Sequence, residues 1–114
     1  MIKMYGLKNC DTCRKALKWM DAEGIAHEFL DLRKGGLDSA DVKDWLTSVG
    51  DETLINRRGT TWRQLTDNQK STTCTEALTA LIMGQPAIMK RPVFVRGNTV
   101  VVGFKDEQMA ALTA

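Results

Sequence analysis

A Cys-x-x-Cys motif stands where a strand-like segment meets a helix-like segment, and this placement constrains the fold more than any other feature. Residues 2–7 alternate apolar and polar side chains, which favours a strand. Residues 11–23 repeat apolar side chains at helical spacing and are followed by Gly24, which predicts a helix with a glycine after its C-terminus. A second strand is predicted over residues 25–32. The chain therefore begins β-α-β, with a right-handed crossover between two parallel strands.

The middle of the chain has a different pattern, and residues 37–89 are predicted to form a helical insert. Ser39 is expected to be the N-cap of the first helix of this insert. Residues 51–59 are expected to be irregular. The predicted helices of the insert are 39–49, a short one at about 60–65, and one that Thr73 caps and that carries Cys74 on its apolar face.

The end of the chain returns to sheet. Residues 93–95 and 99–103 flank Gly97-Asn98, which is a two-residue hairpin signal, and a last helix is expected from Asp106. Because a lone hairpin is marginal in water, it should share one sheet with the first two strands. The order β-α-β, helices, then β-β-α, with Cys-x-x-Cys after the first strand, predicts an α/β fold with a thioredoxin-like core.

Composition excludes several classes of function. The chain has 114 residues, which suits a single domain over residues 1–114. Its 16 basic and 14 acidic residues leave a net charge of +2, too weak for a non-specific nucleic-acid binder. No apolar run suits a membrane helix, and the first residues lack the apolar core of a signal peptide. With three cysteines and no sign of an oligomer, we expect a cytoplasmic monomer without nucleic-acid or membrane partners.

The first cysteine of the motif has the surroundings of a reactive thiol. Cys10 lies at the start of a predicted helix, where free backbone N–H groups and the helix dipole stabilise a thiolate. Lys8, Arg14 and Lys15 should lower the pKa of Cys10 further, whereas Asp11 opposes them. A larger thiolate fraction makes Cys10 the predicted nucleophile.

The second cysteine of the motif should be shielded. Cys13 shares a helical face with apolar residues, so we expect it to be the buried resolving thiol and expect alkylation to modify Cys10 first. A zinc site is the alternative, but the only further cysteine and histidine, Cys74 and His27, are unpaired in the sequence. Cys74 is predicted to be a buried structural residue, and His27 a strand residue. An inert cysteine pair is the remaining alternative.

Two basic pairs lie far from the cysteines in the sequence, Arg57-Arg58 and Lys90-Arg91. Pro92 follows the second pair, and an X-Pro bond before a strand can be cis, which would aim Arg91 at the cysteines. A guanidinium group suits a carboxylate or another oxyanion. The predicted anion-binding residues are therefore Arg91 and Arg58, together with Lys8 and Arg14 beside the cysteine motif.

The chain resembles the arsenate reductase-related thioredoxin-fold family that includes ArsC, Spx and YffB, and is most similar to the YffB branch. The motifs that carry the resemblance are Tyr5-Gly6, the run from Asn9 to Ala16, the D-x-R-x-x-G-L run Asp31–Leu37, Asn56-Arg57-Arg58-Gly59-Thr60-Thr61-Trp62, Lys90-Arg91-Pro92 and Val102-Gly103-Phe104. The resemblance implies that Cys10 is the nucleophile and that Arg91 is the arginine before a cis-proline. It also implies that Arg58 is the middle-segment arginine, with Arg57 as the other register. Thr12 and Pro92 are expected as structural neighbours of the site.

The resemblance implies a thiol–disulfide oxidoreductase without a bound cofactor and with glutathione as co-substrate. One alternative is an arsenate reductase that uses glutathione and glutaredoxin. Against it, Phe104 follows the glycine after which arsenate reductases of this family carry a third arginine, and Cys13 is present where they rely on one cysteine. The other alternative is an Spx-like redox sensor that binds RNA polymerase.

Overall fold

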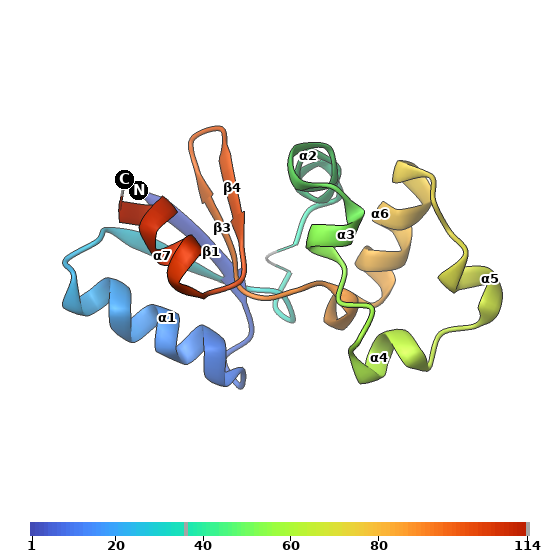
Figure 1. Ribbon diagram of the computed structural model, residues 1–114, viewed down its shortest axis with the longest axis horizontal. Coiled ribbons are helices and arrows are strands. Elements are labelled where there is room, and N and C mark those ends of the chain that lie inside the picture. Colours follow the sequence, from blue (N-terminus) through green and yellow to red (C-terminus); the bar gives the residue numbers. More distant parts are fainter. Residues whose placement is uncertain (36, 114) are drawn as a thin grey trace. The chain divides into compact units, whose positions relative to one another are not determined.

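The computed structural model describes residues 1–35 and 37–113, and it divides into two compact units (Figure 1). The first unit is made by the described residues of Met1–Gly36 and Arg91–Ala114, and the second by Leu37–Lys90. Each unit is described by itself below. The single domain expected over residues 1–114 stays a prediction. The glycine of the D-x-R-x-x-G-L run, Gly36, lies outside the described residues.

The first unit contains a four-stranded sheet in the order β2-β1-β3-β4. The strands are β1 (Ile2–Gly6), β2 (His27–Asp31), β3 (Val93–Arg96) and β4 (Thr99–Val102). β1 pairs parallel with β2 and antiparallel with β3, and β3 pairs antiparallel with β4. The two ends of the chain therefore share one sheet, and the predicted α/β fold with a thioredoxin-like core is confirmed.

Two helices, α1 (Asp11–Ala22) and α7 (Asp106–Thr113), pack against this sheet. Met4 and Phe94 are direct partners in the β1–β3 register, so their side chains lie on one face of the sheet. The core on this face is formed by Ile2, Met4, Cys13, Ala16, Met20, Phe94 and Leu112. Each large apolar side chain buried here contributes about 1.5–3 kcal/mol to folding.

The boundaries of α1 follow from local chemistry. The buried residues Cys13, Ala16 and Met20 recur at helical spacing, as the sequence predicts. The helix ends one residue before the predicted Glu23, and Gly24 adopts a φ of +68°, a conformation that glycine adopts without steric cost.

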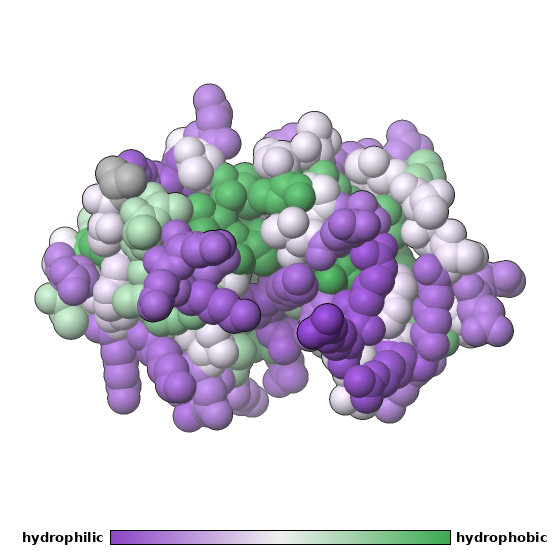
Figure 2. All heavy atoms as spheres, in the orientation of Figure 1, coloured by the Kyte–Doolittle hydropathy of each residue, from purple (hydrophilic) through white to green (hydrophobic). Residues whose placement is uncertain are grey.

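The second unit is helical, as predicted for residues 37–89. Its elements are α2 (Ser39–Val49), α3 (Asp51–Leu54), α4 (Thr60–Arg63), α5 (Asp67–Lys70), α6 (Thr75–Gly84) and the 3₁₀ helix η1 (Pro86–Ile88). Val42, Trp45 and Leu46 are the buried residues of α2. The view in Figure 2 is hydrophilic over α4 and α5, in agreement with the few side chains that these short helices bury.

Three predictions for the insert are wrong in detail. The N-cap of α2 is Asp38, whose Oδ1 accepts a hydrogen bond from the Ala40 N–H at 2.8 Å, and Ser39 is already helical. Residues 51–54 form α3 instead of an irregular segment. The sequence analysis also missed α5, which begins with a capping box between Thr66 and Gln69.

The prediction of a buried Cys74 is also wrong. Cys74 is exposed and is the N-cap of α6, in place of the predicted cap Thr73. Its backbone is extended, with φ −72° and ψ 134°. The helical spacing that places Cys74 on the apolar face holds only for residues with helical backbone, so it does not apply to a cap residue.

Among residues 1–35 and 37–113, no helix is both long enough and apolar enough to cross a membrane.

Candidate active site

Cys10 lies at the junction of β1 and α1, where it is the N-cap of the helix. Its carbonyl accepts the first hydrogen bond of the helix from the Arg14 N–H at 3.0 Å, and its own N–H donates to the Leu7 carbonyl at 3.2 Å. The residue is half-buried rather than fully exposed. The backbone thus holds the thiol in front of the free N–H groups of the first helical turn.

The sulfur of Cys10 receives several hydrogen bonds. Burial acts to raise the pKa of Cys10, but the backbone N–H and the thiol of Cys13, the guanidinium of Arg91 and the backbone N–H of Thr12 together lower it. The net shift has the direction expected for a thiolate at a helix N-terminus. Two of the groups responsible, Cys13 and Thr12, are supplied by the helix itself.

Cys13 has the opposite environment. Its side chain is fully buried in the core against β1. Burial raises the pKa of Cys13 to about 11, and the neighbouring Cys10 adds to this effect, although the backbone N–H of Leu7 and the charge of Arg91 oppose it. At neutral pH Cys13 is therefore a protonated thiol, and it donates a hydrogen bond to the Cys10 sulfur.

Sheet topology brings Arg91 to Cys10. β1 and β3 are antiparallel, with Tyr5 opposite Val93, so the end of β1 lies beside the start of β3. Arg91 precedes β3 and is half-buried, the Arg91–Pro92 peptide is cis, and Pro92 is buried. The expected neighbour Arg91 therefore reaches the Cys10 sulfur across the sheet.

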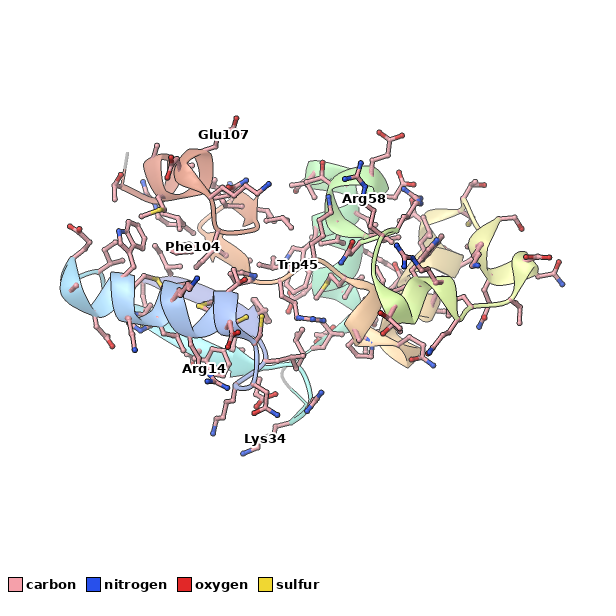
Figure 3. The ribbon with its side chains drawn as sticks, turned by 60° about the horizontal axis from the view of Figure 1, so that its bottom comes forward. Arg14, Lys34, Trp45, Arg58, Phe104 and Glu107 are labelled. Carbon is pink, nitrogen blue, oxygen red and sulfur yellow. The ribbon has the colours of Figure 1, made fainter. Side chains whose placement is uncertain are left out.

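Two basic residues beside the motif, Lys8 and Arg14, lie around the start of α1, and their role in anion binding stays a prediction. Arg14 donates from Nε to the Lys8 carbonyl at 3.0 Å, and its Nη1 lies 3.9 Å from Asp11 Oδ1. The guanidinium thus lies along the β1–α1 connection on the first turn of α1 (Figure 3). Lys8 is exposed. Arg14 and Lys8 contribute to the surrounding charge, whereas Arg91 contacts the sulfur directly.

The other predicted anion-binding residue, Arg58, belongs to the second unit. There it lines an open cleft of about 500 Å³ together with Glu52, Ile55, Asn56, Arg57 and Lys90. Arg57 donates to Asp51 Oδ2 at 2.8 Å, and its Cζ lies 5.3 Å from the centre of the Trp62 ring. These contacts hold the guanidinium of Arg57 in place. That Arg58 meets Cys10 stays a prediction.

The residues considered for a zinc site are dispersed. His27 lies in β2, with Nδ1 2.8 Å from the Ile25 carbonyl oxygen and Nε2 3.6 Å from Asp21 Oδ1. Cys74 lies on α6 in the other unit. In the described parts of the chain, no three histidine, cysteine or acidic side chains are grouped as a metal site needs.

Phe104 directly follows Gly103 and is half-buried in the first unit. Its ring packs edge-on against Trp19 at 5.6 Å between centroids and lies 6.3 Å from Phe94 (Figure 3). Phe104 therefore belongs to an aromatic cluster with Trp19 and Phe94.

Known proteins of similar sequence and fold identify the family of this chain. The ArsC family matches residues 5–112. The chain belongs to the ArsC family. The solved structure of a protein described as YffB (PA3664) is 37% identical to this ArsC-family chain, with a TM-score of 0.91 over 100% of both chains. An uncharacterized protein of Haemophilus influenzae is 35% identical over 100% of both chains.

A more distant relative has a regulatory name. The global transcriptional regulator Spx 1 of Bacillus cereus is 24% identical, over 96% of this ArsC-family chain and 84% of its own length. Together the matches support a family of the thiol oxidoreductase type.

Sequence reasoning missed one feature of the site, the packing of Cys13 against Gly6. A Cβ at Gly6 would lie 2.6 Å from Cys13 Sγ. The glycine itself is visible in the sequence at the end of the first strand. Its partner emerges only when helix and sheet are packed together.

Proposed function

We propose that this ArsC-family protein is a thiol–disulfide oxidoreductase in which Cys10 is the nucleophile and glutathione is the co-substrate. The observation that carries the proposal is the set of hydrogen-bond donors around the Cys10 sulfur, from Cys13, Arg91 and Thr12. These donors stabilise a thiolate at a helix N-terminus, which is the environment of reactive cysteines. Such chemistry suits a reducing compartment such as the cytoplasm.

The first step is attack of the Cys10 thiolate on one sulfur of a substrate disulfide. The new S–S bond joins Cys10 to that sulfur, the old S–S bond breaks, and the other substrate sulfur leaves as a thiolate with the bonding electron pair. A low pKa also makes Cys10 a good leaving group when the mixed disulfide is resolved.

Resolution has two routes. In one, Cys13 loses its proton to solvent and attacks Cys10, which releases the bound thiolate and leaves a Cys10–Cys13 disulfide; two glutathione molecules then reduce this bond and form glutathione disulfide. In the other, a glutathione thiolate attacks the substrate sulfur of the mixed disulfide, the S–S bond to Cys10 breaks, and Cys10 leaves as a thiolate, which gives a glutathione–substrate mixed disulfide. The high pKa of Cys13 slows the first route near neutral pH, so an external thiol has a role in turnover.

Glutathione also fits the charge of the site, because it carries carboxylates. Arg91 lies at the Cys10 sulfur, and a guanidinium binds a carboxylate through two parallel hydrogen bonds. Arg58 is the second proposed carboxylate ligand, from the cleft of the helical unit. No bound cofactor is needed for this chemistry.

The test is turnover of a small disulfide in the presence of glutathione, glutathione reductase and NADPH. Cys10→Ser should abolish turnover, and Cys13→Ser should slow it or accumulate a mixed disulfide visible by mass spectrometry. Cys74→Ser is the matched control, since its thiol is exposed and lies on α6, and it should retain activity. Turnover that survives in Cys10→Ser would refute the mechanism.

Arsenate reduction is tested in the same assay with arsenate in place of the disulfide. Phe104 packs against Trp19 and offers no cation to the oxyanion, so we expect disulfide turnover to exceed arsenate turnover. If NADPH oxidation were faster with arsenate than with the disulfide, the protein would be an arsenate reductase instead.

An Spx-like regulator is the second candidate, because a relative named Spx 1 matches over 96% of this chain. A regulator should bind RNA polymerase in one redox state of the Cys10–Cys13 pair and should show no turnover with small disulfides. If only the oxidised form of the chain captured RNA polymerase, and no disulfide turnover were seen, the protein would be a regulator.

A further inference from the structure

We infer that Gly6 is a positioning residue for the resolving thiol: its missing side chain leaves the space that Cys13 Sγ fills beside Cys10. The inference rests on the proposed function for the role of Cys13 as a resolving thiol. The packing that carries it is independent of any activity.

Gly6 is not required by backbone conformation. It is the last residue of β1, in register with Asp31 of β2, and its carbonyl accepts a hydrogen bond from the Leu32 N–H at 3.0 Å. The glycines with positive φ lie elsewhere in the chain. Alanine could therefore adopt this strand conformation, and what the glycine provides is space.

The space is taken by one atom. A Cβ at Gly6 would lie 2.6 Å from Cys13 Sγ, whereas Cys13 Cβ and Phe29 Cε1 would be at 3.5 and 3.6 Å. Optimal contacts between heavy atoms lie near ~3.5–4.0 Å. The sulfur is therefore the single group with which an alanine side chain would collide.

The sulfur has little freedom to move away. Cys13 is fully buried between β1 and α1, in contact with a packed core, and interiors of this kind have few voids. Its side chain has one rotatable bond, so a shift requires either another rotamer or movement of the helix. Both change the position of the Cys13 thiol relative to Cys10, to which it donates a hydrogen bond.

The reacting geometry depends on this position. In the resolving step Cys13 first loses its proton to solvent, and its thiolate then attacks the Cys10 sulfur. The Cys10–substrate S–S bond breaks, and the substrate thiolate leaves with the electron pair. A small misplacement of a reacting atom can cost on the order of a hundredfold in rate. Gly6 acts on this step through Cys13 and touches no substrate.

The first test is a double-mutant cycle in urea unfolding. Gly6→Ala should destabilise the wild-type chain, and most of that loss should disappear in the Cys13→Ala background, where the sulfur is absent. Gly84→Ala is the control, because its Cβ would meet nothing within 4 Å. If Gly6→Ala alone fails to fold, recovery of folding in the double variant supports the inference. An equal loss in both backgrounds, or failure of both to fold, overturns it.

The second test measures the ionisation of Cys10 and the rate of the resolving step. In reduced Gly6→Ala, the acid dissociation constant of Cys10, followed by ultraviolet thiolate absorbance, should fall about tenfold as the hydrogen bond from Cys13 is disturbed. Release of a thiol from a preformed Cys10 mixed disulfide should slow by about tenfold or more. An unchanged titration and release rate would overturn the inference. Turnover by Cys10→Ser would instead remove the proposed function and leave the packing result standing.

Discussion

The contrast between Cys10 and Cys13 predicts a selective alkylation pattern in the folded, reduced chain. The pKa of Cys10 is below its ordinary value of 9.0 and that of Cys13 is about 11, so well below both values the thiolate fraction of Cys10 exceeds that of Cys13 by at least about 100-fold. A thiolate of higher pKa is intrinsically more nucleophilic, which offsets about tenfold of this difference. Ionisation and intrinsic nucleophilicity together therefore favour Cys10 by at least about tenfold, and the burial of Cys13 increases the preference further.

The assay is a time course with iodoacetamide, read by mass spectrometry of the peptides that contain each cysteine. Cys74→Ser removes the exposed competitor on α6. Labelling of Cys10 should rise with pH and level off once the pH passes a midpoint below 9.0, because the thiolate is the reacting form and the site lowers its pKa. Arg91→Gln should move this midpoint upward, since one hydrogen bond to the thiolate is lost.

Unfolding the same chain in denaturant is the control for intrinsic reactivity. In the unfolded chain Cys10 and Cys13 should react at similar rates, because burial and the hydrogen bonds to sulfur are gone. Equal labelling of the two cysteines in the folded chain would refute the reasoning. So would a Cys10 midpoint at or above 9.0, because the hydrogen bonds would then fail to outweigh burial.

Four further substitutions test local contacts within the two units, each by urea unfolding. Asp38→Ala should lower the free energy of unfolding by about 1 kcal/mol, because the N-cap of α2 is lost, whereas Ser39→Ala should change it little. A larger loss in Ser39→Ala than in Asp38→Ala would show that Ser39 is the cap. Phe104→Ala should cost about 2 kcal/mol, because the ring is half-buried against two aromatic neighbours; a negligible loss would contradict the aromatic cluster. Asp51→Asn should cost less than about 1 kcal/mol. The hydrogen bond from Arg57 lowers the pKa of Asp51, so this difference is present above the unfolded carboxyl pKa of ~3.9 and should vanish as pH falls through the lower folded value.

The helices of the insert show where local patterns fail. α3 and α5 are four residues long, too short for an apolar periodicity, although the Thr66-x-x-Gln69 capping box of α5 is a readable sequence signal. Cys74 was assigned to a buried face because its spacing fits a helix, but its backbone is that of a cap. Helical spacing predicts burial only inside the helix.

The cysteine site likewise has features that follow from one local segment and features that depend on contacts between distant segments. The placement of Cys10 at a helix start and the burial of Cys13 follow from spacing within one segment, since the N-terminal dipole and the apolar face are properties of a single helix. Arg91 is far from Cys10 in the sequence, and its contact with the sulfur depends on the antiparallel pairing of β1 with β3.

Sequence patterns alone predict the thioredoxin-like core with its helical insert, the position of Cys10 where a strand meets a helix, and the burial of Cys13. Those features depend on periodicity and on the physics of one helix end. The hydrogen bond from Arg91 to the Cys10 sulfur, which the sequence suggests only through Pro92, and the close packing of Cys13 against Gly6 become visible once strands and helix are packed together. The physical reason is that hydrogen bonds and steric contacts act over a few ångströms of space, and the pairing of strands and the packing of helix on sheet determine which distant residues come that close.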